Sequence, residues 1–166
     1  MFYSPKKNKK GLVTSASLLA LFSVMNMTAP LFENYRGIVA AVSLLFLASS
    51  LYVLIRFSIG RYSYEITSDT FVITKTTGKK SANVAVLLLS TAYGVVKTPK
   101  TKEEHASLRE KFGQIDVWMS HYNDLFAKTY VYVTEFNGKT YAFRIEIDEG
   151  FAKKLNDAID SKKVFF

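Results

Sequence analysis

The sequence predicts a membrane-anchored α+β protein, in which two transmembrane helices precede an antiparallel β-domain that is capped by a C-terminal helix. Three observations support this fold class. Residues 11–32 and 37–55 carry no charged side chain. Beyond them, apolar and polar residues alternate with the period of β-strands. The last stretch, residues 149–162, returns to helical spacing with an apolar stripe on one side.

The two charge-free runs have the length of membrane spans. At a rise of roughly 1.5 Å per residue they reach about 33 and 28 Å, and a hydrocarbon core is about 30 Å thick. One alternative is a pair of buried core helices, although charge-free runs of this length are uncommon in soluble domains. The other is a cleaved signal peptide, but the first run exceeds a typical signal core and a second run follows at once. We therefore expect a two-span helical hairpin over residues 12–59.

Basic residues predict the orientation of this hairpin. The tail over residues 1–11 is basic, and two arginines follow the second run: Lys6, Lys7, Lys9 and Lys10, then Arg56 and Arg61. Cytoplasmic loops of membrane proteins carry an excess of Lys and Arg. The sequence thus predicts a multi-pass protein of a bacterial inner (plasma) membrane, with both termini in the cytoplasm and the linker 33–36 outside.

Small residues stand four apart in both apolar runs: Ala16 with Ala20, and Gly37 with Ala41. This spacing permits close helix packing. It favours packing of the two hairpin helices on each other, and a homo-oligomer is the alternative. No ionisable residue lies inside either run, which disfavours a pump or transporter.

Residues 62–166 are predicted to form a cytoplasmic β-domain. Its first hairpin has alternating apolar residues on both sides of a Ser68-Asp69 turn. Gly78 suits a second turn because a turn often needs a positive φ. The apolar run 84–89 is too short for a third span. It predicts a buried strand that continues toward residue 96, either unbroken or with a break near Tyr93-Gly94.

The second half of the domain begins with a charged segment, residues 99–113, which predicts a short helix ending at Gly113. A strand over 115–119 follows. Asn137-Gly138 then separates two alternating runs, the strongest hairpin signal in the chain. A two-residue type I′ turn there pairs Thr134 with Tyr141, Tyr132 with Phe143, and Tyr130 with Ile145. Asp148 is placed to cap the final helix.

This order of elements resembles the bacterial pleckstrin-homology-like (PH-like) membrane proteins over roughly residues 37–160. The residues that carry the resemblance are Tyr64-Glu65-Ile66-Thr67 with Asp69, Phe71-Val72-Ile73, Gly78-Lys79-Lys80, and the last hairpin leading to Phe151 and Leu155. The resemblance implies a partly open, strongly bent antiparallel barrel that the C-terminal helix caps at one end. The resemblance does not point to a particular reaction or ligand, because most members of the family have no assigned biochemical role.

Residue types limit the chemistry that the chain can perform. It has no cysteine, which excludes disulfides and thiolate catalysis, and it has two histidines, His105 and His121. Glu103-Glu104-His105 is more simply a solvated helix face than a metal half-site, because no second ligand has a recognisable spacing. Phosphate-binding loops and nucleophile motifs are missing from the sequence. We therefore predict a protein that is not an enzyme and needs no metal or cofactor.

Charge distribution indicates the kind of partner. The chain carries a net +8, and residues 56–102 hold eight basic but only two acidic residues. Basic residues near a membrane are attracted to anionic lipid, and nonspecific charge that orients the domain against lipid is a simpler interpretation than a head-group site. The candidate lipid-facing set is Arg56, Arg61, Lys75, Lys79 and Lys80. Nucleic acid is a poor partner, because the aromatic residues are patterned for a core.

Taken together, these features predict a non-catalytic interaction module anchored at the cytoplasmic face. Membrane lipids surround its helices, and a groove or open strand edge binds a membrane or cytoplasmic protein partner. The alternative is a domain that senses anionic lipid through the basic residues.

Overall fold

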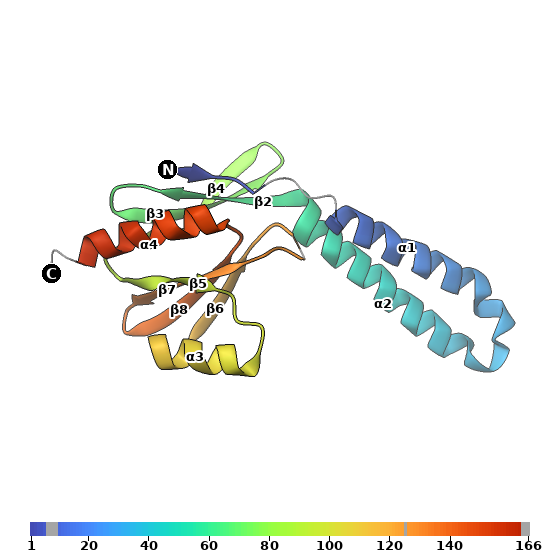
Figure 1. Cartoon of the computed structure of the whole chain (residues 1–166). Coiled ribbons are helices and arrows are strands. Elements are labelled where there is room, and N and C mark those ends of the chain that lie inside the picture. Colours follow the sequence, from blue (N-terminus) through green and yellow to red (C-terminus); the bar gives the residue numbers. More distant parts are fainter. Residues whose placement is uncertain (6–9, 125, 164–166) are drawn as a thin grey trace. The chain divides into compact units, whose positions relative to one another are not determined.

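The computed structural model describes residues 1–5, 10–124 and 126–163, and the chain forms two compact units. One unit is a helical hairpin that ends at Arg61 and includes Asn123 and Asp124. The other is a β-domain that combines the first residues of the chain with those from Tyr62 onward. Figure 1 shows both units and labels most of their helices and strands. Lys6, Lys7 and Lys9 of the predicted basic tail lie outside the described residues.

The helical unit consists of two long helices joined by short turns. They are α1 (Lys10–Thr28) and α2 (Arg36–Leu54), with 3-10 turns at Ala29–Leu31 and Glu33–Tyr35 and a π-helical turn at Ile55–Ile59. Both helices are long and apolar enough to cross a membrane. The prediction of two N-terminal apolar helices is therefore confirmed.

The two helices pack along a seam of buried and half-buried residues spaced alternately four and three apart. The seam includes Gly11, Ser15, Leu18, Phe22 and Met25 on α1, and Val39, Ser43, Phe46, Ser50 and Val53 on α2. This spacing is typical of helices that wind around each other. The small residues Ala16, Ala20, Gly37 and Ala41 are all exposed. The hairpin helices therefore pack on each other, but not through the small residues that the sequence suggested.

Hydroxyl groups inside the seam bond across it. The Ser50 Oγ donates to the Ser15 carbonyl oxygen at 2.8 Å, and the Ser15 Oγ donates to the Ser50 carbonyl oxygen at 3.0 Å. Farther along, the Asn26 side-chain amide donates to the Ser43 Oγ at 3.3 Å. These four polar side chains thus bond across the two helices, whereas the hydroxyls of Ser23 and Thr28 donate to carbonyl oxygens of their own helix.

The β-domain contains two four-stranded sheets and two helices (Figure 1). The first sheet has the order β1 (Phe2–Tyr3), β2 (Gly60–Ile66), β3 (Thr70–Thr77), β4 (Lys80–Leu88). The second has the order β5 (Ala92–Lys97), β7 (Tyr130–Phe136), β8 (Lys139–Ile145), β6 (Val117–His121). The helices are α3 (Lys102–Phe112) and α4 (Glu149–Lys163). The α+β class is therefore confirmed.

The core lies between the inner faces of the two sheets and α4. From α4, Phe151, Leu155 and Ile159 are fully buried against the core residues of both sheets, including Tyr64 and Tyr132. The helix begins as predicted, because the Asp148 carboxylate accepts a hydrogen bond from the Phe151 N–H at 2.7 Å.

Two other local predictions are confirmed. Asn137 and Gly138 both have a positive φ, of 50° and 71°, as a type I′ turn requires. The register of β7 and β8 is the predicted one, with Tyr132 opposite Phe143.

The α3 helix begins with a capping box between Thr101 and Glu104.

Three features of the β-domain differ from the prediction. The strand pair β6–β8 is parallel, so the sheets are not purely antiparallel. This is possible because the connection from β6 to β7 passes β8, which lies between them in the sheet. The run 84–96 is divided between β4 and β5, which belong to different sheets because a turn intervenes at residues 89–91. Finally, Phe2–Tyr3, which was assigned to the basic tail, pairs with β2 as the edge strand β1.

Candidate functional site

The outer face of β4 is apolar and exposed. The sequence predicted a buried strand here, and that prediction is wrong. Val84, Val86 and Leu88 are 43%, 59% and 53% exposed, because nothing in the described chain covers the outer face of this strand. The inner-facing residues Ala85 and Leu87 are only partly buried. Period-2 alternation is present, but both faces are apolar.

The backbone of β4 is also open along one side. β4 pairs with β3 on one side and is the last strand of its sheet. Near its end, the Leu88 carbonyl points away from β3 and accepts a hydrogen bond from the Tyr132 hydroxyl at 3.1 Å. Backbone direction alternates along an antiparallel strand. The N–H and C=O of Val86 therefore point toward the same open side.

The other sheet edges are short or covered. On β5, the Asn156 side chain of α4 accepts from the Val95 N–H at 2.8 Å and donates to the Val95 carbonyl at 2.9 Å. The Lys163 ammonium donates to the Tyr93 carbonyl at 2.9 Å. β1 has two residues and β6 has five. Natural edge strands are usually blunted by charge, proline or a cover. From Ser81 to Leu88, β4 has no charge and no proline, although it has a bulge beside Asn83.

An apolar groove runs beside this open edge. Its volume is about 460 Å³. One wall is β4, and the rest comes from the turn after β4 and from strands of the second sheet: Val84, Ala85, Val86, Leu87 and Leu88, then Thr91, Met119, Thr134, Glu135, Phe136, Tyr141 and Phe143. We call this the β4 groove. Met119 of β6 and Phe143 of β8 are register partners, so β6 and β8 contribute neighbouring side chains to it.

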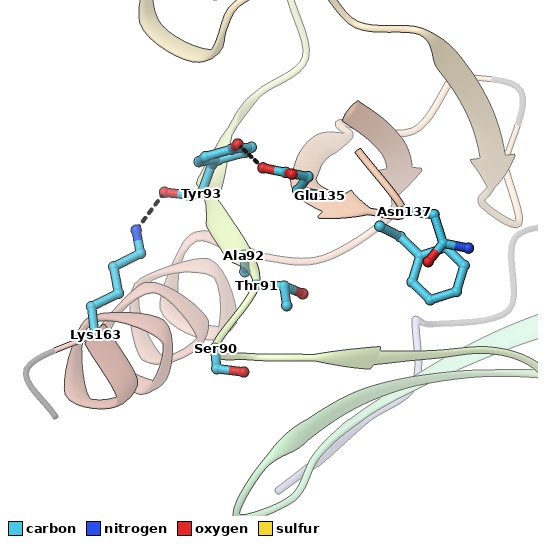
Figure 2. Close-up of a pocket in the computed structure, with 8 residues that line it drawn as sticks. Ser90, Thr91, Ala92, Tyr93, Glu135, Asn137 and Lys163 are labelled. Carbon is cyan, nitrogen blue, oxygen red and sulfur yellow. Dashed lines mark hydrogen bonds between the residues drawn. The ribbon is translucent and has the colours of Figure 1, made fainter. Parts of the chain in front are cut away.

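A second pocket adjoins the groove. It has a volume of about 440 Å³ and shares Thr91, Glu135 and Phe136 with the β4 groove. Figure 2 shows the Tyr93 hydroxyl directed at the Glu135 carboxylate, to which it donates a hydrogen bond, and Lys163 reaching the Tyr93 backbone. The hydrogen bond to Glu135 raises the pKa of Tyr93. These side chains are already bonded to one another.

The structure brings together three of the five predicted basic site residues. Lys79 lies in the turn between β3 and β4, and Lys80 is the first residue of β4. Lys75 of β3 pairs with Ala82 of β4, and its ammonium lies 5.9 Å from the centre of the Tyr62 ring. All three lysines are exposed.

Arg56 and Arg61 belong to the helical unit. The Arg56 guanidinium lies 5.2 Å from the centre of the Phe57 ring, and Arg61 is exposed at the start of β2.

The positions of the histidine and acidic side chains decide whether the described residues could hold a metal ion. Within residues 1–5, 10–124 and 126–163, no group of three or more His, Asp or Glu side chains lies close enough to hold a metal ion. His105 lies beside Trp118, with ring centres 6.2 Å apart, and His121 stacks near Phe143. The features that the site does offer are an open backbone edge, an apolar groove and a cluster of cations.

Comparison with known proteins gives no further guide to these features. No family model matches the sequence, and neither a curated protein nor a solved structure is detectably similar to it.

Proposed function

We propose that the protein is a non-catalytic, membrane-anchored interaction module whose β4 edge and β4 groove bind an extended segment of a protein partner. The observation that carries this proposal is the unprotected edge of β4 beside an apolar groove. From Ser81 to Leu88 this edge strand carries no charge, and soluble domains usually suppress such an edge. Its retention here is explained if another strand pairs with it.

Strand addition would use both parts of the site. Backbone groups of the partner would pair with outward-directed groups such as those of Val86, while alternate side chains would enter the groove over Met119 and Phe143. The backbone bonds would supply affinity, and the shape of the groove would select side chains.

We further propose that α1 and α2 hold this domain at the cytoplasmic face of a bacterial plasma membrane as a two-pass anchor. β1 precedes α1 and β2 follows α2, yet the two strands belong to one sheet. Both ends of the hairpin would then be on the same side of the membrane, which requires an even number of crossings. Arg56 and Lys10, at the two ends of the hairpin, favour the cytoplasmic side.

We also propose a PH-like fold for the β-domain. The support is the order of two sheets followed by a C-terminal helix that packs on the core between them. The parallel strand β6 is a departure from an all-antiparallel barrel.

The proposal can be tested by photo-crosslinking in intact membranes. A photoreactive residue placed at position 84 in the full-length protein should give a discrete protein adduct. A second change, Val86→Pro, removes one outward N–H and should abolish the adduct, whereas Val86→Ala keeps that N–H and should preserve it. A photoreactive residue at Lys154, on the exposed side of α4, is the matched control. Equal adducts at positions 84 and 154, or adducts insensitive to Val86→Pro, would count against strand addition.

A further inference from the structure

We infer that the segment bound along β4 has apolar side chains at alternate positions and acidic side chains at the end that lies beside Lys75 and Lys80. This inference rests on the proposed function and specifies the chemistry of the partner. It follows from the order in which side chains occur on the inner face of the first sheet.

The inner face changes from apolar to cationic along the hairpin. The register pairs Phe71 with Leu87, Ile73 with Ala85, Lys75 with Ala82, and Thr77 with Lys80. Partners in an antiparallel pair place their side chains on the same face. Because Phe71 and Ile73 are buried in the core, this whole series lies on the inner face. A strand laid beside β4 would therefore meet Leu87, Ala85, Ala82 and Lys80 in turn.

The opposite side of the β4 groove is apolar over its central part. Met119, Tyr141 and Phe143 line it, and the rings of Tyr141 and Phe143 stack with their centres 6.4 Å apart. Successive side chains of a strand point to opposite faces. Every second residue of a bound segment would thus face these aromatic and thioether groups, and burial there favours apolar types.

The charge at the β3–β4 turn is uncompensated. Residues 75–88 contain three lysines and no acidic residue. Within the described residues, none of these lysines forms an ion pair, whereas Lys162 of α4 pairs with Asp69. Lys75 and Lys80 lie on the same face of the hairpin as the groove wall, between the groove and the β3–β4 turn. A carboxylate on the bound segment is the complementary group.

Peptide probes can test this chemistry on the full-length protein in nanodiscs of neutral lipid. The probes are three fluorescent peptides with the same core of alternating threonine and valine. Two carry a pair of aspartates, at the N-terminal or the C-terminal end, and the third carries a pair of lysines at both ends. We expect one of the acidic peptides to bind roughly tenfold more tightly than the lysine peptide at low salt. That preference should fade as ionic strength rises.

Charge-reversal variants locate the preference. Lys75→Glu combined with Lys80→Glu should remove or reverse it, whereas the matched double change Lys153→Glu and Lys154→Glu, on exposed positions of α4, should leave it unchanged. Equal binding of all three peptides, insensitive to Lys75 and Lys80 but lost in Val86→Pro, would overturn this inference and leave the proposed function standing. Absence of binding by any peptide, or binding insensitive to Val86→Pro, would count against both.

A lipid role for the lysines is distinguished by the membrane composition. If the acidic-peptide preference disappears when neutral nanodiscs are replaced by anionic ones at the same ionic strength, the lysines are engaged by lipid head groups and the inference is overturned. If the preference persists in both, the lysines act on the bound segment.

Discussion

At the scale of single residues, two buried tyrosines join the sheets of the β-domain. The Tyr64 hydroxyl donates to the His121 carbonyl and accepts from the Glu146 N–H at 3.0 Å, which links β2 to the second sheet. The link in the other direction runs from the second sheet to the first: the Tyr132 hydroxyl of β7 donates a hydrogen bond to the Leu88 carbonyl at the end of β4. Each of these bonds joins a side chain on a strand of one sheet to the backbone of the other sheet or of a loop beside it. The bonds therefore hold the two sheets, and with them the wall of the β4 groove, in position.

Replacing Tyr64 with Phe removes both hydrogen bonds of its hydroxyl at a fully buried position. We expect the free energy of unfolding of the β-domain to fall by about 2 to 3 kcal/mol. The fluorescence of Trp118, the single tryptophan of the chain, reports urea unfolding of this unit. Tyr93→Phe is the control, because that exposed hydroxyl should contribute no more than about 0.5 kcal/mol. Equal losses in both variants would contradict this role for Tyr64.

The same tyrosines predict a response to alkaline pH. Burial raises the pKa of Tyr64 and of Tyr132 above the usual value near 10. The folded protein disfavours the phenolates, so above about pH 10 the unfolded chain loses these protons first and folding becomes less favourable. Below about pH 10 the tyrosines are protonated in both the folded and the unfolded chain, so their full contribution to the free energy of unfolding is present. Stability of Tyr64→Phe should fall less steeply above about pH 10 than that of the unmodified protein, and identical slopes would refute this cause.

At the scale of elements, the helical hairpin depends on polar contacts inside its seam. Ser15→Ala and Ser50→Ala should each destabilise the hairpin by about 0.5 to 1 kcal/mol. The double variant should lose less than the sum, because the two Oγ atoms also lie 2.9 Å apart, so that removing either hydroxyl takes away a hydrogen-bonding neighbour of the other. Detergent-denaturation titrations of the four proteins measure this coupling. Ser49→Ala, at an exposed neighbouring position, should have little effect; strict additivity would show that the two serines act independently.

Elements were predictable from the sequence where a local signal determines the backbone. Asn137-Gly138 fixes both a turn and a register, and the apolar stripe around Leu155 identifies α4 and its buried side. The exposure of β4 was not predictable, because an apolar strand has the same sequence whether its outer face is covered or open. The strand β1 is two residues long and has no pattern of its own; its pairing depends on a partner some sixty residues away. Lys79 and Lys80 were identified by composition, but their position beside the groove depends on strand register.

At the scale of the whole molecule, the account predicts a defined topology. Because the chain has no cysteine, single cysteines can report it. An impermeant maleimide should label Asn34→Cys, between the helices, in intact cells. It should label Ser4→Cys and Lys154→Cys only after permeabilisation, because β1 and α4 belong to the same unit. Simultaneous accessibility of positions 34 and 154 would contradict the two-pass arrangement.

The proposed function requires that the outward N–H and C=O groups of β4 are free to pair with another strand. Residue-resolved hydrogen exchange on the full-length protein measures this. In the free protein, the Val86 N–H should exchange at least about ten times faster than the Leu87 N–H, which faces β3. Binding of an extended peptide should slow exchange at Val86 and leave Leu87 unchanged. Slow exchange at both residues in the free protein would show that the edge is already covered, and would contradict the account.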